Sequence, residues 1–262
     1  MPTSALHVAR TGLEAQDARM RVIANNLANI GTTGYKRDRA NFATLAYQDN
    51  RIAGQQSSNE TAYATGLNLG TGVSVQSTTS ITTQGTLSTT SNALDFALDG
   101  DGYFQVQLPG GKLGYTRAGN FSRSAEGQLV TGQGYALQPA IAIPEDAASI
   151  TVGPDGTVSV TTSASATPTE IGQITVASFA NPAGLQALGD NFLAETAASG
   201  AAQVGAPGDG TRGSIRQGML EASNVNVVEE LVDMIECQRA YEINSKMISS
   251  VDEMLRNANQ TL

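Results

Sequence analysis

Two glycine-rich stretches of this sequence have spacings that could support ligand binding. GDGTRG (208–213) matches the glycine spacing of dinucleotide-binding loops, yet it follows Pro207 rather than a strand, and no helix is expected after it. DGDG (99–102) begins like a calcium-binding loop, but Tyr103 and Gly110 stand where further side-chain oxygen ligands are needed. We therefore interpret the first stretch as a loop and the second as a hairpin turn.

The remaining candidates for catalysis are few. His7 is the only histidine and lies near the start of a predicted helix, which disfavours a Ser/His/Asp triad or a histidine metal site. Cys237 is the only cysteine, so an intramolecular disulfide is excluded, and its mid-helix position indicates a small packing residue. Asp95, Asp99 and Asp101 adjoin glycine turns, where acids are usually solvated. The sequence predicts neither an enzyme nor a cofactor or metal site.

Composition restricts the class of protein further. The 262 residues suffice for one large or two modest domains, and a formal net charge of −9 argues against a nucleic-acid partner. Charged residues make up 15%, against roughly 25% in an average soluble protein. The amino terminus, MPTSALHVARTGLEAQ, lacks the regions of a signal peptide, and no stretch is apolar enough to span a membrane. We expect either a cytoplasmic protein or export by a machine that leaves its signal uncleaved.

A long helix is predicted at the amino terminus. From Ser4 to about Asn29 there is no proline, and Gly12 is the only glycine. Apolar residues recur every seven positions, with a second series three residues later that is interrupted by Gln16. We expect Ser4 or Thr3 to cap the start of the helix, and Gly31 to end it with a positive φ.

A second helix is predicted from about Val227 to Asn257, with a matching seven-residue apolar series. Asn226 and Glu229 fit an N-cap and its acidic partner three residues on. Either helix alone would indicate packing on a globular core. Two matched helices at opposite ends favour an antiparallel coiled coil of the two termini, one that needs neighbours from other subunits.

The middle of the chain is predicted to be β-structure. Alternating apolar residues flank DGDG (99–102), SAEG (124–127) and GPDG (153–156), which indicates at least three hairpins in an antiparallel barrel or sandwich. Residues 161–170 read as a flexible surface loop, and 47–66 and 197–213 as extended linking segments.

The predicted fold class is α+β, with paired terminal helices and a central antiparallel β domain. Its expected parts are an N-terminal helix of an inner domain, a connecting segment, the β domain, a second connecting segment and a C-terminal helix of the same inner domain. In the same order, their boundaries are residues 1–30, 31–70, 71–200, 201–225 and 226–262.

Several stretches resemble a known family. ANNLANIGTTGYKRDRANF (24–42) is similar to the amino-terminal motif of the bacterial flagellar rod and hook proteins, and residues 222–255 resemble that family's carboxyl-terminal helix. Residues 94–106 and 115–135 resemble its shared β domain. The chain length and residues 47–66 resemble the distal-rod branch of the family, which points away from proximal rod and short hook subunits. A secreted β-rich adhesin or enzyme is the alternative from another class.

The resemblance implies a structural subunit that self-assembles into a hollow helical shaft, the distal rod of the basal body, which transmits torque to the hook. It implies a location from the periplasm to the outer membrane, and export through the flagellar type III apparatus without cleavage. The expected partners are further copies of the chain, proximal rod subunits, hook or junction subunits, P- and L-ring proteins and the export apparatus.

The terminal helices would form the assembly interface. Asparagine is a mediocre helix residue, so the amides near the end of the first helix are expected to bridge backbone carbonyls in the packed tube. The predicted interface residues are Leu6, Leu13, Met20, Leu27, Asn25, Asn26, Asn29, Val227, Met234, Tyr241, Ile248 and Leu255.

Overall fold

A computed structural model describes residues 2–56, 63–162 and 165–260 of the chain. Its helices and strands are α1 (Pro2–Ala28), β1 (Asp38–Thr44), β2 (Gln48–Arg51), β3 (Leu67–Leu69), β4 (Val73–Ser80), β5 (Leu87–Thr89), β6 (Phe96–Asp99), β7 (Tyr103–Gln107), β8 (Leu113–Thr116), β9 (Ser122–Arg123), β10 (Leu129–Val130), β11 (Leu137–Gln138), β12 (Ala147–Val152), β13 (Thr157–Thr162), β14 (Ser165–Gln173), β15 (Val176–Ser178), β16 (Gln186–Gly189), β17 (Phe192–Ala194), β18 (Gln203–Gly205), β19 (Ser214–Gln217), β20 (Met219–Glu221) and α2 (Val227–Gln260). Two short 3-10 helices cover Pro109–Gly111 and Pro182–Gly184.

The chain divides into two compact units. The first, which we call the helical unit, contains residues 1–27, 38–79 and 226–262; the second, the β unit, contains 28–37 and 80–225. Helices therefore stand at the two ends of the chain around a mostly antiparallel β region, as the sequence predicted.

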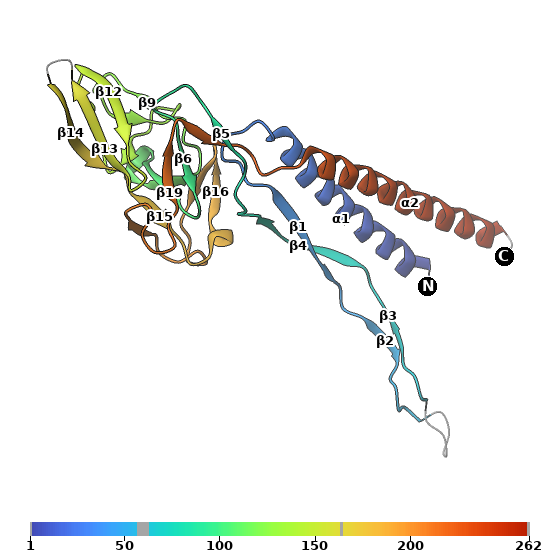
Figure 1. Cartoon of the computed structure of the whole chain (residues 1–262). Helices are drawn as coiled ribbons and strands as arrows, with labels where there is room; N and C mark the ends of the chain where they lie inside the picture. Colours follow the sequence, from blue (N-terminus) through green and yellow to red (C-terminus); the bar gives the residue numbers. More distant parts are fainter. Residues whose placement is uncertain (1, 57–62, 163–164, 261–262) are drawn as a thin grey trace. The chain divides into compact units, whose positions relative to one another are not determined.

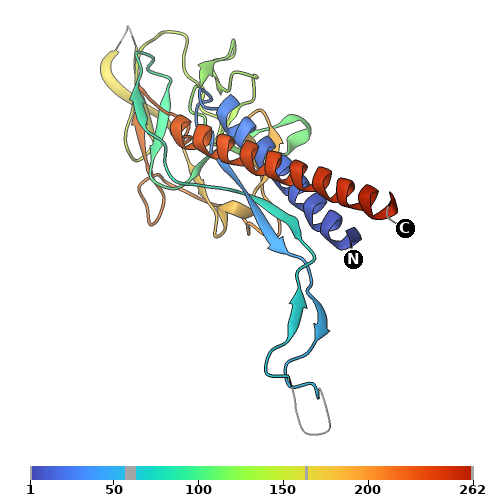
Figure 2. The same cartoon turned by 90° about the vertical axis from the view of Figure 1, so that its right-hand side faces the viewer.

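In the helical unit, α1 and α2 lie side by side in both cartoon views (Figure 1, Figure 2). The same unit contains the two-stranded pairings of β1 with β4 and of β2 with β3. The pairing of β2 with β3 is antiparallel, so part of the segment 47–66 is one arm of a β ribbon rather than an unpaired linker. No helix in the described part of the chain is long and apolar enough to cross a membrane.

The caps of the two helices differ in how well the sequence predicted them. The Asn226 side chain accepts a hydrogen bond from the Val228 amide at 3.1 Å, which confirms the predicted N-cap of α2. The prediction for α1 is wrong, because this helix begins at Pro2 and Ser4 lies inside it. Thr3 is inside it too, and its side chain lies outside the described residues.

The positive φ after α1 occurs at Gly34 (φ 69°) and not at Gly31, so that prediction is also wrong. A Cβ on Gly34 would lie 2.7 Å from the backbone carbon of Arg117. Glycine is therefore needed at this position for backbone approach as well as for conformation.

The β unit is built on a seven-stranded sheet with the order β16-β17-β8-β7-β15-β18, to which β11 adds by pairing with β7. A three-stranded sheet, β12-β13-β14, and the pairs β6–β19, β5–β20 and β9–β10 complete it. Because the large sheet ends at β16 and β18, the described strands do not close into the barrel that was one expectation.

Two of the three predicted hairpins are confirmed. SAEG (124–127) joins β9 to β10, and GPDG (153–156) joins β12 to β13. The hairpin predicted across DGDG (99–102) is wrong: β6 pairs with β19, whereas β7 pairs with β8, β11 and β15. A Cβ on Gly102 would lie 2.2 Å from the Val176 side chain, so the turn packs closely on β15 while the chain leaves one sheet for another.

The other two stretches that were predicted as loop or linker also contain strand residues. Residues 165–170 belong to β14, which pairs with β13, while residues 163 and 164 lie outside the described part. β18 falls within 197–213 and pairs with β15. Serine, threonine and glycine gave little apolar signal, but both segments obtain backbone hydrogen bonds from a neighbouring strand.

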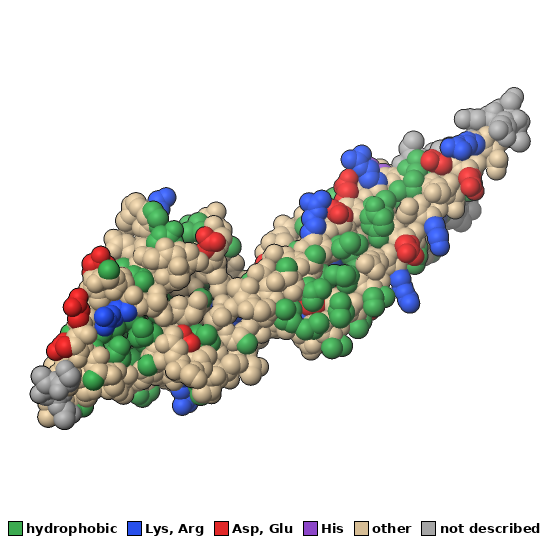
Figure 3. Space-filling view, turned by 90° about the horizontal axis from the view of Figure 1, so that it is seen from above, with side chains coloured by type: hydrophobic (Ala, Val, Ile, Leu, Met, Phe, Trp, Pro, Cys, Tyr) green, Lys and Arg blue, Asp and Glu red, His purple; other side chains and the backbone are tan. Residues whose placement is uncertain are grey.

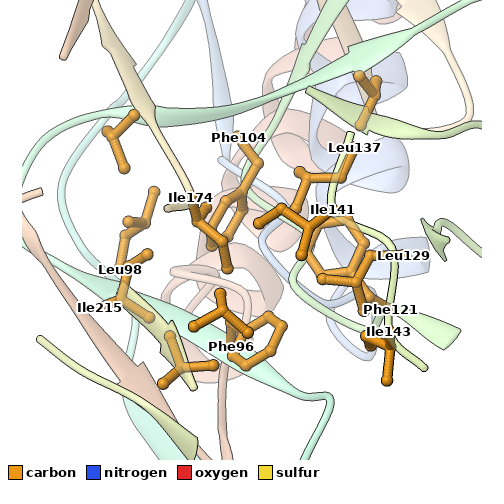
Figure 4. Packing of buried hydrophobic residues seen from close by; sticks show 14 of the residues in the cluster. Phe96, Leu98, Phe104, Phe121, Leu129, Leu137, Ile141, Ile143, Ile174 and Ile215 are labelled. Carbon is orange, nitrogen blue, oxygen red and sulfur yellow. The ribbon is translucent and has the colours of Figure 1, made fainter. Parts of the chain in front are cut away.

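The core of the β unit is apolar and includes three packed aromatic rings (Figure 4). The ring of Phe121 lies 5.3 Å from that of Phe104 and 6.0 Å from that of Phe96, measured between centroids. All three phenylalanines are almost fully buried. Burial of such side chains supplies most of the stabilisation of a β unit of this kind.

Candidate assembly interface

The two terminal helices contact each other through a seam that contains several polar side chains. From one end to the other, the recorded contacts join Asn26 to Glu230, Arg19 to Asp233, Gln16 to Cys237 and Gly12 to Asn244. As the residue number falls along α1 it rises along α2, so the helices run antiparallel.

Gly12 explains how the helices approach closely at one point of this seam. A Cβ at that position would lie 3.1 Å from the Asn244 amide nitrogen. Glycine in a helix interior costs about 1 kcal/mol relative to alanine. Here the missing side chain makes room for the Asn244 amide of the other helix.

Asn26 shows what an asparagine near the end of α1 can do. Its side chain is buried, and its amide donates to the Asp38 carbonyl and accepts from the Asp38 N–H, both at 2.9 Å. The same amide nitrogen lies 3.3 Å from both carboxylate oxygens of Glu230. Asn26 thus ties the end of α1 to the first residue of β1 and to the first turns of α2, within one chain.

The other two asparagines have different surroundings. Asn25 is exposed. Asn29 is half-buried, and its side-chain oxygen accepts a hydrogen bond from the Thr32 hydroxyl at 3.1 Å. The three predicted asparagines therefore do not form one cluster of buried amides.

Glu230 is a buried carboxylate in the first turns of α2, with an exposed fraction of 3%. Its backbone N–H donates to the Asn226 carbonyl at 3.0 Å, and the Asn26 amide nitrogen lies 3.3 Å from both oxygens of its carboxylate. A buried carboxylate needs donors of this kind to offset its desolvation. The search for a seven-residue apolar period could not identify Glu230 as a seam residue, because it considers apolar residues only.

Cys237 is fully buried at the middle of the seam. Its thiol donates to the Gln16 carbonyl at 3.1 Å, and burial raises the pKa of the thiol above its ordinary value. A buried, protonated thiol is a poor nucleophile, so this geometry suits packing.

The predicted apolar series on α2 does not coincide with this seam. Val227 and Tyr241 are exposed, Met234 and Ile248 are half-buried, and the side chain of Leu255 lies outside the described part. A straight α-helix drifts by about 20° for every seven residues, so a strict heptad series crosses from one face toward another. Among the side chains of α2 that the structure describes, Glu230, Cys237 and Val251 are buried.

On α1 the seven-residue series lies at the margin of the buried face. Leu6, Leu13, Met20 and Leu27 are all half-buried. Of the described side chains of α1, those of Ala9, Thr11, Ala15, Ile23 and Asn26 are buried in the single chain.

The most prominent feature of the helical unit is a second apolar face on α2. Seven large apolar side chains on this helix face are between 44% and 69% exposed, and we call them the exposed stripe. Its members are Val228, Leu231, Val232, Ile235, Ile243, Met247 and Met254. At 3.6 residues per turn, Val228, Val232 and Ile235 lie on the side of α2 opposite the buried Glu230 and Cys237, whereas Met247 and Met254 lie four residues before and three residues after Val251 and so border its buried face. A space-filling view shows hydrophobic side chains gathered on the helical unit (Figure 3).

Exposed apolar side chains that gather on one helix in this number are typical of a protein interface. Four members, Val232, Ile243, Met247 and Met254, were missed by the heptad search. Apart from the adjacent Leu231 and Val232, neighbouring members of the stripe are three, four, seven or eight residues apart, so a search at a period of 3.6 would have found these four.

Comparison with known proteins finds family matches in three regions of the chain. Residues 6–36 match the family described as flagella basal body rod protein, residues 97–160 the flagellar hook protein FlgE/F/G D1 domain, and residues 216–261 the flagellar basal body rod FlgEFG protein C-terminal region. The chain belongs to this family of flagellar basal-body rod proteins, whose members are structural components rather than enzymes.

Individual relatives refine the comparison. The chain is 49% identical over 255 residues to the flagellar basal-body rod protein FlgG of Buchnera aphidicola subsp. Schizaphis graminum, covering 97% of this chain and 98% of the relative. It is 47% identical over 257 residues to FlgG of Caulobacter vibrioides, with 98% of both chains covered. Against the rod protein FlgF of the same organism the identity is 32% over 263 residues, with 99% and 98% covered.

Proposed function

We propose that this protein is the structural subunit of the distal flagellar rod, and that many copies assemble into a hollow helical shaft that transmits torque to the hook. The main support for the proposal is the exposed stripe of α2, because this chain belongs to the rod family and the stripe is left uncovered in the single chain. A helix that is apolar on one face and packed on another has a surface that remains to be covered. A repeated contact between copies would cover it.

The comparison within one organism supports a FlgG-like subunit over another axial member. In Caulobacter vibrioides the chain shares 47% of its residues with FlgG and 32% with FlgF, over almost the same length. A proximal rod protein or a short hook protein would not be expected to show that difference.

We further infer that α1 and α2 pair as an antiparallel coiled coil in the assembled shaft. The contacts from Asn26–Glu230 to Gly12–Asn244 support the direction of pairing. In this proposal the inner domain consists of residues 1–30 and 226–262, and the β domain faces outward. The predicted leucines and heptad residues of both helices, together with Asn25 and Asn29, would then contact neighbouring copies, whereas Asn26 bonds within its own chain.

Proposed partners and location follow from the rod assignment. The subunit would lie in the basal body between periplasm and outer membrane, next to proximal rod subunits, hook or junction subunits and the P- and L-ring proteins. It would reach that place through the flagellar export apparatus, without cleavage.

Electron microscopy of the purified, concentrated protein tests the proposal directly. We expect straight hollow rods, because an axial subunit carries its own assembly contacts. Curved filaments would instead indicate a hook-type subunit. A protein that stays monomeric at every concentration, and also fails to restore rods to cells that lack their own distal rod subunit, would overturn the proposal.

A further inference from the structure

Three charged side chains meet in the interior of the β unit. The Lys36 ammonium lies 2.5 Å from Glu221 Oε1, and Arg117 Nε lies 3.5 Å from Glu221 Oε2. The side chains of Lys36, Arg117 and Glu221 are 9%, 4% and 1% exposed, respectively. Two cations and one carboxylate are thus removed from water together, which is costly unless they remain paired.

The surrounding groups compensate the charges only in part. Arg117 donates to the Gly100 carbonyl at 2.8 Å, and its guanidinium carbon lies 5.7 Å from the centroid of the Tyr103 ring. Lys36 also donates to the Thr83 carbonyl at 2.8 Å. In the described part of the chain, Arg117 Nη1 and Glu221 Oε2 have no hydrogen-bond partner. Both cations therefore depend on the carboxylate of Glu221.

Glu221 is also the point at which three distant segments join. Its Oε1 accepts a hydrogen bond from the Gly85 amide at 3.0 Å, and its carbonyl accepts one from the Gly34 amide at 2.7 Å. The next residue, Ala222, donates its amide hydrogen to the Thr86 carbonyl at 2.9 Å. One residue near the carboxyl end thus holds the segments 34–37 and 83–86.

A second side chain repeats this arrangement three residues later. Asn224 accepts a hydrogen bond from the Arg37 amide at 2.7 Å and donates to the carbonyls of Ile81 and Thr83 at 2.8 and 3.0 Å. The amide of Asn224 therefore links the same two chain segments that Glu221 links. Neither link is local, because the sequence separation between Lys36 and Glu221 is 185 residues.

We propose that Glu221 acts as a latch, meaning that its buried carboxylate allows the β unit to fold completely only when the segments 34–37 and 219–224 are both in place. Until residues 219–224 dock, Lys36 and Arg117 lack the carboxylate that both contact in the folded β unit, so the segment 34–37 does not take up its folded position. Once they dock, the residues that follow α1 and those that precede α2 are held in one folded body. The latch is independent of the proposed rod function, since it acts within a single chain.

Hydrogen exchange of the full-length monomer, read amide by amide, tests the latch. The amides of Gly34, Arg37, Gly85 and Ala222 report on it, because each donates to a partner across the joined segments. Glu221→Gln keeps the size and an acceptor oxygen but removes the charge. We expect it to speed exchange at all four amides by on the order of 100-fold or more, while amides of β7 and β8 are unchanged.

Three further variants make the test decisive. Glu195→Gln, which neutralises an exposed carboxylate of the same unit, should leave the four amides as in the wild type. Lys36→Met should release Gly34 and Arg37 even if Glu221→Gln cannot be purified as a folded protein. The double variant Lys36→Met/Glu221→Gln should open less than the two single effects combined, because each charge is unfavourable mainly without the other. Faster exchange at Gly85 alone in Glu221→Gln, or unchanged Gly34 and Arg37 in Lys36→Met, would overturn the proposal.

Discussion

Replacing Ile243 measures how much the exposed stripe contributes to polymer growth. Ile243 is 62% exposed in the single chain, so assembly has most of its apolar surface to cover. Full burial of an isoleucine side chain is worth about 1.5–3 kcal/mol, and the part that alanine loses at this exposure is about 1 kcal/mol. Because 1.4 kcal/mol is a factor of ten in an association constant, Ile243→Ala should raise the critical concentration about fivefold.

Ile243→Asp should have a much larger effect than Ile243→Ala. A carboxylate desolvated in an apolar contact costs several kcal/mol, and in a polymer this cost recurs at every subunit. Rods should therefore be absent at concentrations hundreds of times above the wild-type threshold. In the monomer the aspartate would face water, so the free energy of unfolding should change by no more than about 0.5 kcal/mol.

The assay is sedimentation of the polymer over a concentration series, with electron microscopy of the pellet and circular dichroism of the monomer. Ser245→Asp is the matched control, because Ser245 is exposed on α2 but lies away from the stripe. An unchanged critical concentration for Ile243→Ala, or normal rods from Ile243→Asp, would show that the stripe is not an assembly contact. A loss of rods that is equal in Ser245→Asp would show that charge on any face of α2 is sufficient.

Four further expectations can be checked on the purified protein. Asn26→Ala should weaken the local structure by about 2 kcal/mol, because it removes the side chain that bonds both the N–H and the carbonyl of Asp38, and should speed exchange of the Asp38 amide about 30-fold. Deletion of residues 47–66 should leave thermal unfolding of the β unit unchanged but alter the shape or stiffness of the rods; a protein that fails to fold would place this segment in the core. Burial raises the pKa of Tyr115 to about 12, whereas the phenol of an unfolded chain titrates near 10.0. The unfolded state therefore loses its proton first, and the free energy of unfolding should fall between about pH 10 and 12. Tyr115→Phe should show a shallower fall, and a pH profile identical to that of the wild type would contradict the raised pKa of Tyr115. The buried thiol of Cys237 should react with an alkylating reagent at pH 8 far more slowly in the folded protein than in denaturant, and equal rates would contradict its burial.

Features that depend on neighbours in sequence could be read without the structure. The two terminal helices follow from long stretches without proline and with helical spacing of apolar residues. The Asn226 cap and the turns at SAEG and GPDG are also local, since the side chain or turn residues act within a few positions. The motifs at both ends and in the β region were sufficient to indicate the family.

The partners of β6 and of Asn26 were decided only by tertiary structure. DGDG has the residues of a hairpin turn, but β6 pairs with β19, more than a hundred residues away, and backbone hydrogen bonding carries no signal of which distant strand will supply it. Asn26 resembles a misplaced helix residue until Asp38 and Glu230 are brought beside it.

The exposed stripe of α2 separates most clearly what the sequence determines from what the tertiary structure determines. Apolar residues surround much of α2, and the sequence specifies their spacing but not which face the first helix will cover. The fold places Glu230 and Cys237 in the seam, and leaves Ile243 and Met254 outside. Helical periodicity determines that a residue lies on a given side of a helix, whereas the burial of that side depends on which other segment packs against it.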